Sequence, residues 1–164
     1  MKQLQHLLLL SIVCLVLSSC SFMGNICLGS YSPSIVDDQQ RMLQAGDSFF
    51  YRNRNLSLTN RNASLSFRGF HGIETLYRLD CDQSGYVTIT ISSSVDTTHF
   101  KLVLVDTVRQ EVVTLIQGSG YANRTVNLKA GRYYIKSVGY DVEGSVSINL
   151  SVPLAVNVSA QASR

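Results

Sequence analysis

Strict alternation of apolar and polar residues in the second half of the chain limits the folds that it can adopt. Residues 145–152 read Ser-Val-Ser-Ile-Asn-Leu-Ser-Val, and residues 86–92 read Tyr-Val-Thr-Ile-Thr-Ile-Ser. Successive side chains of a β-strand point to opposite faces, so a period of two predicts strands with one buried and one solvated face. No long segment carries the 3.6-residue period of an amphipathic helix.

Turn-forming residues divide the chain into short strands of this kind. Glycine or polar clusters at 93–98, 117–120, 129–131 and 139–144 predict turns between them. Strands are expected at 47–52, 55–59, 63–69, 76–81, 85–92, 99–105, 108–116, 121–128, 131–138 and 145–152. Close spacing of short strands predicts an all-β fold, an antiparallel β-sandwich of the jelly-roll or immunoglobulin-like type, over residues 47–153. The tail, residues 154–164, is expected to fray.

Composition narrows the class of partner. The 164 residues allow one domain, and charged residues make up only 15% of them, because Ser, Thr and Asn fill the polar positions. The net charge is only +3, which argues against a nucleic-acid or other general polyanion binder. An arginine-rich stretch between residues 41 and 78 is the local exception. It is interpreted either as a solvated face or as a contact surface for an anionic partner.

The N-terminus has the pattern of an export signal. Lys2 precedes an apolar run over residues 7–17, which is shorter than the roughly 20 apolar residues that a membrane-spanning helix needs. The sequence Leu-Ser-Ser-Cys at residues 17–20 resembles the lipobox of bacterial lipoproteins. That resemblance implies a signal peptide at residues 1–19 and a diacylglycerol on Cys20. By the same resemblance, the non-acidic Ser21 implies sorting to the outer membrane.

Residues 20–46 are interpreted as the lipidated N-terminus and a flexible tether. Gly, Ser and Pro interrupt this stretch, and only residues 37–46 hold a candidate for one short helical turn. Cys14 leaves with the signal peptide and Cys20 carries the lipid, so Cys27 and Cys81 remain in an oxidising compartment. A disulfide between them is expected to contribute about 2–4 kcal/mol. A free thiol and an intermolecular bridge are the alternatives.

Residues 74–152 resemble the bacterial pre-peptidase C-terminal domain, a β-sandwich appended to secreted proteases. The similarity is greatest over residues 126–138, Val-Asn-Leu-Lys-Ala-Gly-Arg-Tyr-Tyr-Ile-Lys-Ser-Val, where a tight turn at Gly131 precedes a Tyr-Tyr pair. Alternation implies that Tyr133 and Tyr134 point to opposite faces, one into the core and one to the surface. The sequence has Lys101 where the family often has an acidic residue, so a calcium role does not follow from the resemblance.

The sequence contains no convincing catalytic or metal-binding constellation. No Gly-x-Ser-x-Gly elbow accompanies His71 or His99, and both histidines are assigned structural roles. The acids near Asp80 and Asp96 lack the later Glu of an EF-hand, so neither a metal nor a cofactor is expected. Asn-x-Ser/Thr sequons occur at residues 55, 62, 123, 149 and 157, and beside a bacterial lipobox they are interpreted as a by-product of polar strands.

Two sets of residues remain as candidates for contact with a partner. Three are arginines (Arg52, Arg54 and Arg61), and three are tyrosines that could form a stacking platform (Tyr121, Tyr134 and Tyr140). The leading hypothesis is a non-enzymatic envelope lipoprotein that binds another protein of an outer-membrane or secretion assembly through the arginines. The alternatives are a carbohydrate- or peptidoglycan-binding module that uses the tyrosines, and an inhibitor of an envelope-directed enzyme.

Overall fold

Nine strands and a short helical segment make up residues 33–161, the part of the chain that the computed structural model describes. The segment consists of η1 (Pro33–Val36) and α2 (Gln39–Leu43). The strands are β1 (Ser48–Phe50), β2 (Asn53–Leu58), β3 (Asn62–Cys81), β4 (Gly85–Val95), β5 (Phe100–Asp106), β6 (Glu111–Gln117), β7 (Gly120–Leu128), β8 (Gly131–Ser151) and β9 (Val156–Ala160). The apolar residues of the alternating segments are buried, as in β4, which buries Val87, Ile89 and Ile91.

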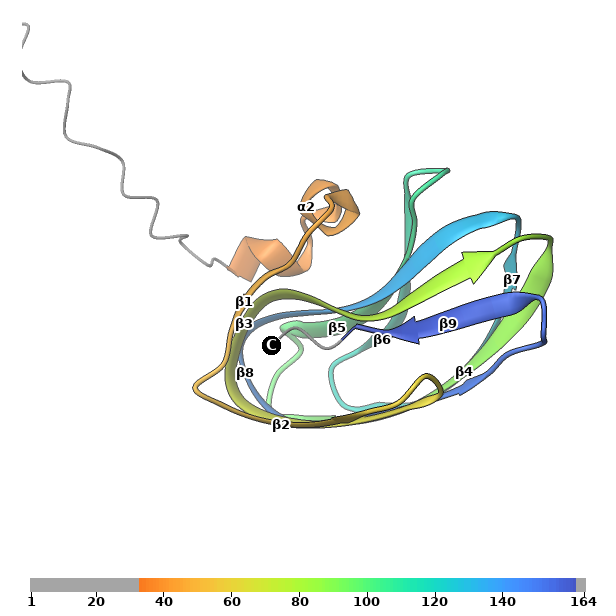
Figure 1. Cartoon of the computed structure of the whole chain (residues 1–164). Coiled ribbons are helices and arrows are strands. Elements are labelled where there is room, and N and C mark those ends of the chain that lie inside the picture. Colours follow the sequence, from red (N-terminus) through yellow and green to blue (C-terminus); the bar gives the residue numbers. More distant parts are fainter. Residues whose placement is uncertain (1–32, 162–164) are drawn as a thin grey trace, which may run out of the picture. The chain divides into compact units, whose positions relative to one another are not determined.

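One antiparallel sheet folds over itself into two packed layers, which confirms the predicted β-sandwich (Figure 1). The first layer runs β2–β3–β8–β4–β7, and the second runs β9–β3–β8–β5–β6. Strands β3 and β8 belong to both layers because each bends over between them. Strand β1 pairs with β3 at this bend, through residues 71–73 of β3.

The prediction of separate strands on either side of each bend is wrong. Residues 63–69 and 76–81 both belong to β3, and residues 131–138 and 145–152 both belong to β8. Glycines bend these strands instead of ending them. Gly72 and Gly144 have positive φ angles of 110° and 150°. A Cβ atom on either would lie 2.1 Å from the backbone oxygen of Ser48 or 2.2 Å from that of Ser94, so only glycine allows the neighbouring strand to approach.

The main core fills the space between the two layers. Near the bend it is aromatic: the rings of Phe67 and Phe100 stack with centroids 5.6 Å apart, and Phe70 meets both edge-on. Tyr133 is buried in this core whereas Tyr134 is only partly buried, as the alternation at the Tyr-Tyr pair predicted.

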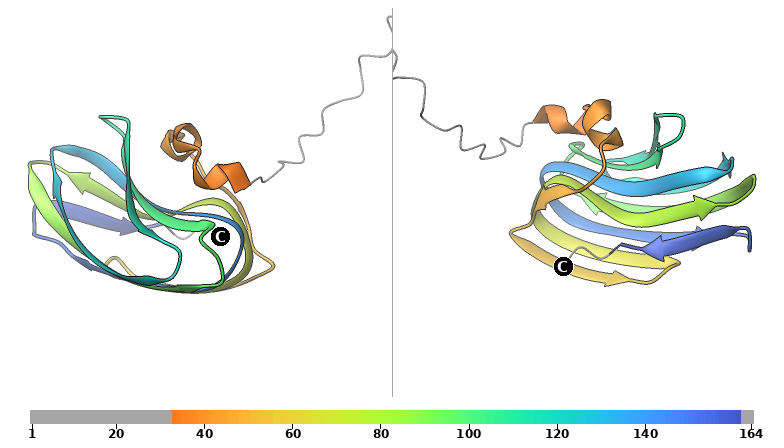
Figure 2. Two further views of the ribbon diagram at one scale, coloured as in Figure 1. Left: turned by 180° about the vertical axis from the view of Figure 1, so that it is seen from behind. Right: turned by 45° about the horizontal axis from the view of Figure 1, so that its top comes forward.

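A second apolar cluster covers the outer side of the second layer. Val103, Val105 and Val138 face outward there, and η1 and α2 close over them with Ile35 and Met42 (Figure 2). Residues 33–46 are therefore part of the folded domain, and the expected boundary between tether and domain at residues 46/47 is wrong. The apolar side chains of this short stretch pack on a valine-rich face of the second layer. The local sequence pattern did not predict this contact, because the valines lie far away in the sequence.

The C-terminal boundary also differs from the expectation. Residues 154–164 were expected to be a loose tail, but β9 pairs with β3 from Tyr77 to Cys81 and completes the edge of the second layer. Cys81 is buried, with a thiol that is free within the described residues. Its predicted disulfide partner Cys27 and the predicted lipidation site Cys20 lie outside them, so both modifications stay predictions. No helix among residues 33–161 is long and apolar enough to span a membrane.

Candidate binding face

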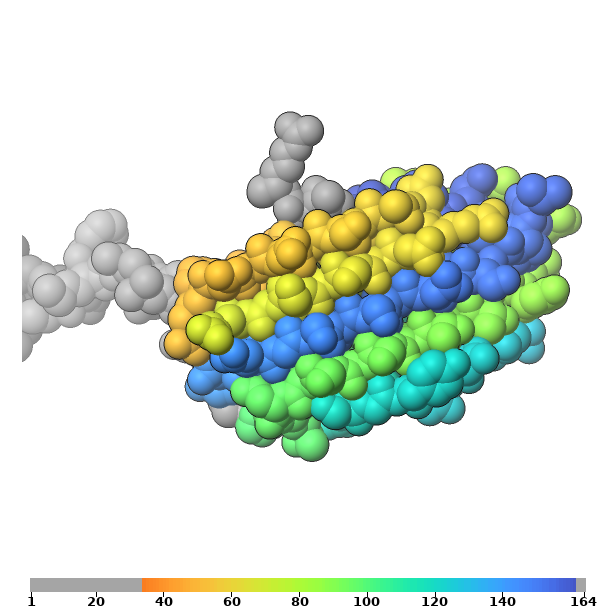
Figure 3. Space-filling model, turned by 90° about the horizontal axis from the view of Figure 1, so that it is seen from below, coloured from red at the N-terminus to blue at the C-terminus, as the bar shows by residue number. Residues whose placement is uncertain are grey.

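Strands β2, β3, β8, β4 and β7 lie side by side on the outer side of the first layer (Figure 3). Small polar side chains cover this side, and we call it the polar face. Only Ser, Thr, Asn and Tyr occupy its outward positions on the five strands. These positions lie between residues 53 and 66 on β2 and β3, 86 and 94 on β4, 121 and 127 on β7, and 145 and 151 on β8. Charged side chains appear only at its margin, where Arg68 pairs with Glu143 at 2.9 Å. The face is therefore hydrophilic and uncharged.

The sequons follow from this arrangement. Side chains two residues apart on a strand share a face, so each Asn-x-Ser/Thr places an amide and a hydroxyl on the same side. Four of the five sequons, those that begin at Asn55, Asn62, Asn123 and Asn149, lie on strands of the first layer with both polar residues outward. The sequons are thus a local signature of the polar face.

Strand register aligns these side chains into rows across the layer. One row crosses all five strands and consists of Ser57, Ser64, Ser147, Ser92 and Tyr121. Neighbouring strands are about 4.8 Å apart, and successive residues of one face are about 6.6 Å apart along a strand. The row is therefore a line of hydroxyl groups that ends at an aromatic ring on the edge strand β7.

This row lies in a shallow hollow of about 370 Å³. Its lining includes the row itself together with Thr59, Asn62, Thr90 and Asn149. Tyr121 stands at one side with 69% of its surface exposed. The hollow thus combines a polar floor with an exposed aromatic ring, and both features can bind a ligand rich in hydroxyl groups.

Most hydroxyls in the hollow keep their hydrogen-bonding capacity. Ser64, Ser92 and Ser147 form no side-chain hydrogen bond with any described residue, whereas Asn149 Nδ2 donates to Asn62 Oδ1 at 2.6 Å. A hydroxyl can donate one hydrogen bond and accept two, and an amide has both donors and an acceptor. The floor therefore presents donors and acceptors side by side, which suits a ligand whose own groups both donate and accept.

Tyr86 is a second exposed aromatic residue on the polar face, which sequence reasoning missed as a contact residue. It is 56% exposed, lies opposite Asn127 of β7, and does not line the hollow. A signal for it was present: Tyr86 alternates in phase with Thr88 and Thr90, so it had to lie on their solvated side.

The three tyrosines predicted to form a stacking platform do not lie together. Tyr121 is on the polar face, whereas Tyr134 lies on the outer side of the second layer, beside the second apolar cluster. Tyr140 is at the bend, where its ring meets those of His71 and His99 at 5.3 and 6.4 Å. The predicted platform is wrong because β7 and the first half of β8 belong to different layers; only Tyr121 lines the hollow.

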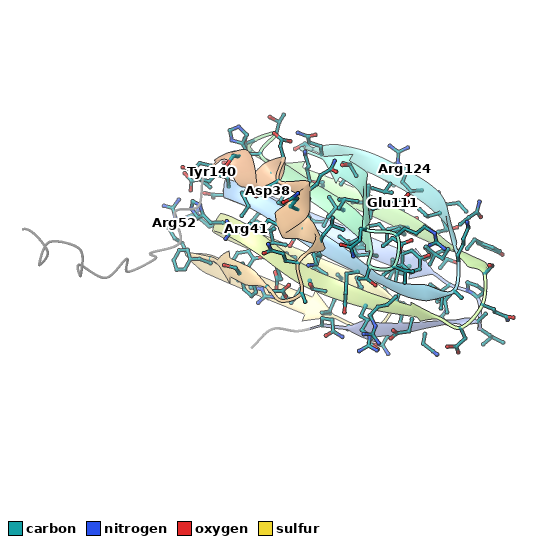
Figure 4. All side chains as sticks on the ribbon, turned by 90° about the horizontal axis from the view of Figure 1, so that it is seen from above. Asp38, Arg41, Arg52, Glu111, Arg124 and Tyr140 are labelled. Atoms are coloured by element: carbon teal, nitrogen blue, oxygen red, sulfur yellow. The ribbon has the colours of Figure 1, made fainter. Side chains whose placement is uncertain are left out.

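The predicted arginine surface is largely neutralised within the fold. Arg52 pairs with Asp141 at 3.0 Å, close to Tyr140 at the bend end of the molecule (Figure 4). Arg54 points inward and pairs with Glu74, which also accepts a hydrogen bond from Tyr51. Arg61 is exposed on the turn between β2 and β3, and no ion pair joins it to a described residue. Two of the three arginines therefore already have acidic partners.

Glu74 is the charged group most deeply enclosed in the sandwich. It is fully buried, and this burial raises its pKa, although the hydrogen bond from Tyr51 and the charge of Arg54 act in the opposite direction. The guanidinium of Arg54 also lies 5.2 Å from the ring centroid of Tyr51. Removal of one partner from a buried pair leaves the other uncompensated, so this cluster holds Arg54 in place as a structural residue.

The acidic loops do not form a metal site. Asp80 is held between Arg78 and Arg132, at 2.6 and 2.9 Å, so its oxygens already have cationic partners. Asp96 accepts a hydrogen bond from the backbone of Glu143 at 3.0 Å. Among the residues that the structure describes, no group of three or more His, Cys, Asp or Glu side chains could hold a metal ion.

No protein family model matches the sequence, and no curated protein matches it either.

Several solved carbohydrate-binding modules resemble the fold distantly. The module "CBM35 from Cellvibrio japonicus Abf62" is 15% identical with a TM-score of 0.37, and the match covers 71% of this chain and 93% of that one. "Xyl-CBM35 in complex with glucuronic acid containing disaccharide" is 18% identical with a TM-score of 0.35, covering 74% and 96%. A family 35 carbohydrate-binding module from an environmental isolate is 17% identical with a TM-score of 0.36, covering 73% and 85%. A likeness of this degree says nothing about the ligand of this chain.

Proposed function

We propose that this protein is a non-catalytic carbohydrate-binding lipoprotein of the bacterial envelope, and that its polar face binds a neutral polysaccharide. The observation that carries the proposal is the row of hydroxyls that runs across the first layer and ends at Tyr121 in the hollow. A sugar ring has hydroxyls at its rim and C–H groups on its faces. The serine and asparagine side chains can bond the rim, and an aromatic ring can stack on the C–H face.

The absence of charge on the polar face supports a neutral ligand. Its outward positions away from the margin hold no acidic or basic residue, so neither an anionic nor a cationic partner finds a counter-ion there. Protein interfaces have a core of aromatic and other large residues. The floor of the hollow is instead composed mainly of Ser, Thr and Asn, which favours a glycan over the protein partner of an envelope assembly.

The proposal includes a lipid anchor at Cys20 in the outer membrane, which rests on the lipobox resemblance alone. Residues 21–32 would join the lipid to Pro33, and this length of chain can reach roughly 40 Å when extended. The folded domain begins with η1, which packs on the outer side of the second layer. The polar face is on the other side of the sandwich from η1.

Replacement of Tyr121 by alanine tests the site. About 140 Å² of a tyrosine side chain is exposed here, and a sugar ring that covers half of it removes roughly 70 Å² from water. At 25 cal/mol per Å² this contributes about 1.7 kcal/mol, so the dissociation constant should rise roughly 20-fold. Tyr86→Ala is the matched control, since this tyrosine is similarly exposed on the same face but outside the hollow.

The measurement is affinity electrophoresis of the full-length protein in detergent, through gels that contain neutral polysaccharides, together with a pull-down on purified peptidoglycan. Retardation by one polysaccharide, lost in Tyr121→Ala and kept in Tyr86→Ala, is the expected result. If no glycan retards the wild type, and a protein co-purifies with it from solubilised envelopes at equal stoichiometry, the glycan proposal is wrong.

A further inference from the structure

A second pocket lies on the opposite side of the sandwich, at a gap in the edge of β3. On the edge of β3 away from β8, β1 pairs as far as Ile73 and β9 begins to pair at Tyr77, so Thr75 has no strand beside it on that edge. The carboxylate of Asp47 fills this position and accepts hydrogen bonds from the backbone N–H of Thr75 at 2.9 Å and from its hydroxyl at 2.6 Å. The space left beside these groups is a pocket of about 350 Å³.

Lys136 lines this pocket and is almost completely buried, with only 2% of its surface exposed. Its Nζ donates to the backbone oxygen of Gln44 at 2.9 Å and lies 5.7 Å from the ring centroid of Tyr134. No other described residue accepts a hydrogen bond from it. An ammonium group has three N–H donors, so two of them have no acceptor among the described protein residues beside the pocket.

Burial of this kind is costly for the charged amine. Desolvation lowers the pKa of Lys136, although the nearby carboxylate of Asp47 acts in the opposite direction. A buried donor without an acceptor from the protein is costly, and more so when it is charged. A ligand that supplies acceptor oxygens to Lys136 would remove this cost, so the pocket is prepared for such a ligand.

We propose that this pocket binds the carboxylate group of a small ligand, with Lys136 as the counter-ion and the ring of Tyr134 as one wall. A carboxylate offers two oxygens, and these match the two unoccupied donors of the ammonium. A single negative charge fits better than a phosphate dianion, because Asp47 already places one carboxylate in the same pocket.

This site is independent of the proposed glycan site. Lys136 and Tyr134 face outward on the second layer, whereas Tyr121 and the serine row face outward on the first. Binding at one site can therefore be lost while the other is unchanged, and failure of the glycan proposal leaves the carboxylate proposal standing.

The test compares benzoate with benzamide, which have the same ring and nearly the same shape but differ in charge. Saturation-transfer NMR on the full-length protein in a non-ionic detergent measures both. We expect saturable binding of benzoate that is at least about tenfold tighter than that of benzamide, because a hydrogen bond between two charged groups is stronger than one to a neutral acceptor. Lys136→Met, which keeps the length and apolar stem of the side chain, should weaken benzoate binding by a similar factor.

Two further variants make the result decisive. Tyr134→Leu keeps the ammonium but removes the ring, and should weaken both probes, which covers the case in which Lys136→Met does not fold. Tyr121→Ala should bind benzoate like the wild type. Equal binding of benzoate and benzamide to the wild type, or unchanged benzoate binding in a folded Lys136→Met protein, would overturn the proposal.

Discussion

Replacement of Met42 by alanine tests whether residues 33–43 belong to the folded domain. Met42 is 2% exposed, and it lies in the second apolar cluster with Val103, Val105 and Val138. Substitution of a buried methionine by alanine costs about 2–5 kcal/mol through lost transfer free energy and the cavity that remains. Because α2 is short and at the surface, it can partly close the cavity, and we expect a loss of about 2–3 kcal/mol.

Urea denaturation followed by circular dichroism measures this loss. If the free energy of unfolding decreases by about 2 kcal/mol per M urea, the urea concentration at the midpoint of unfolding should fall by roughly 1 M. The slope of this dependence should be the same in the variant and the wild type. Thermal unfolding should show a fall in Tm of roughly 10 °C for a domain of this size. Leu43→Ala is the control on the same helix, since this side chain is only half-buried and should cost about 1 kcal/mol.

A flexible tether gives a different result. If residues 33–43 did not pack on the second layer, Met42 would be a solvated side chain, and its replacement would change the free energy of unfolding by less than about 0.5 kcal/mol. A value that small for Met42→Ala, equal to that for Leu43→Ala, would refute the assignment of these residues to the domain.

Three further predictions concern the bend, the buried acid and the cysteines. Gly144→Ala should destabilise the protein by more than about 2 kcal/mol, because its Cβ would meet a backbone oxygen of β4; Gly46→Ala, also at positive φ but with open space around it, should cost clearly less in the same urea assay. Burial raises the pKa of Glu74 above 4.5, so the folded state holds this proton more tightly than the unfolded state. The stability of the wild type relative to Glu74→Gln should therefore rise as the pH falls from neutral toward 4.5, and a difference independent of pH would contradict this. Peptide mapping of the unreduced protein should yield a linked Cys27–Cys81 peptide, whereas separate alkylated peptides would exclude the disulfide.

The alternation of residues was sufficient to determine which side of the first-layer strands is buried. Side-chain direction on a strand depends only on the local backbone, which repeats every two residues. For that reason the sequence correctly predicted the antiparallel sandwich and the opposite environments of Tyr133 and Tyr134. The two-residue repeat also places Tyr86 and the polar residues of the sequons on the solvated side of their strands. The polar face could therefore have been predicted from the sequence, although the sequons were interpreted only as a by-product of polar strands.

The tertiary structure decided everything that depends on contact between distant segments. Gly144 belongs to a segment predicted as a turn, and Gly72 lies between two predicted strands, but the neighbouring strands make both of them bends within continuous strands. Arg52 is neutralised by Asp141, 89 residues further along the chain, and no local pattern reports such a pair. Tyr121 gains its place at the end of the hydroxyl row only because four neighbouring strand pairs set the register. The local sequence determines to which face of a strand a side chain points. Which residues it contacts depends on how the strands pair and how the sheet folds over.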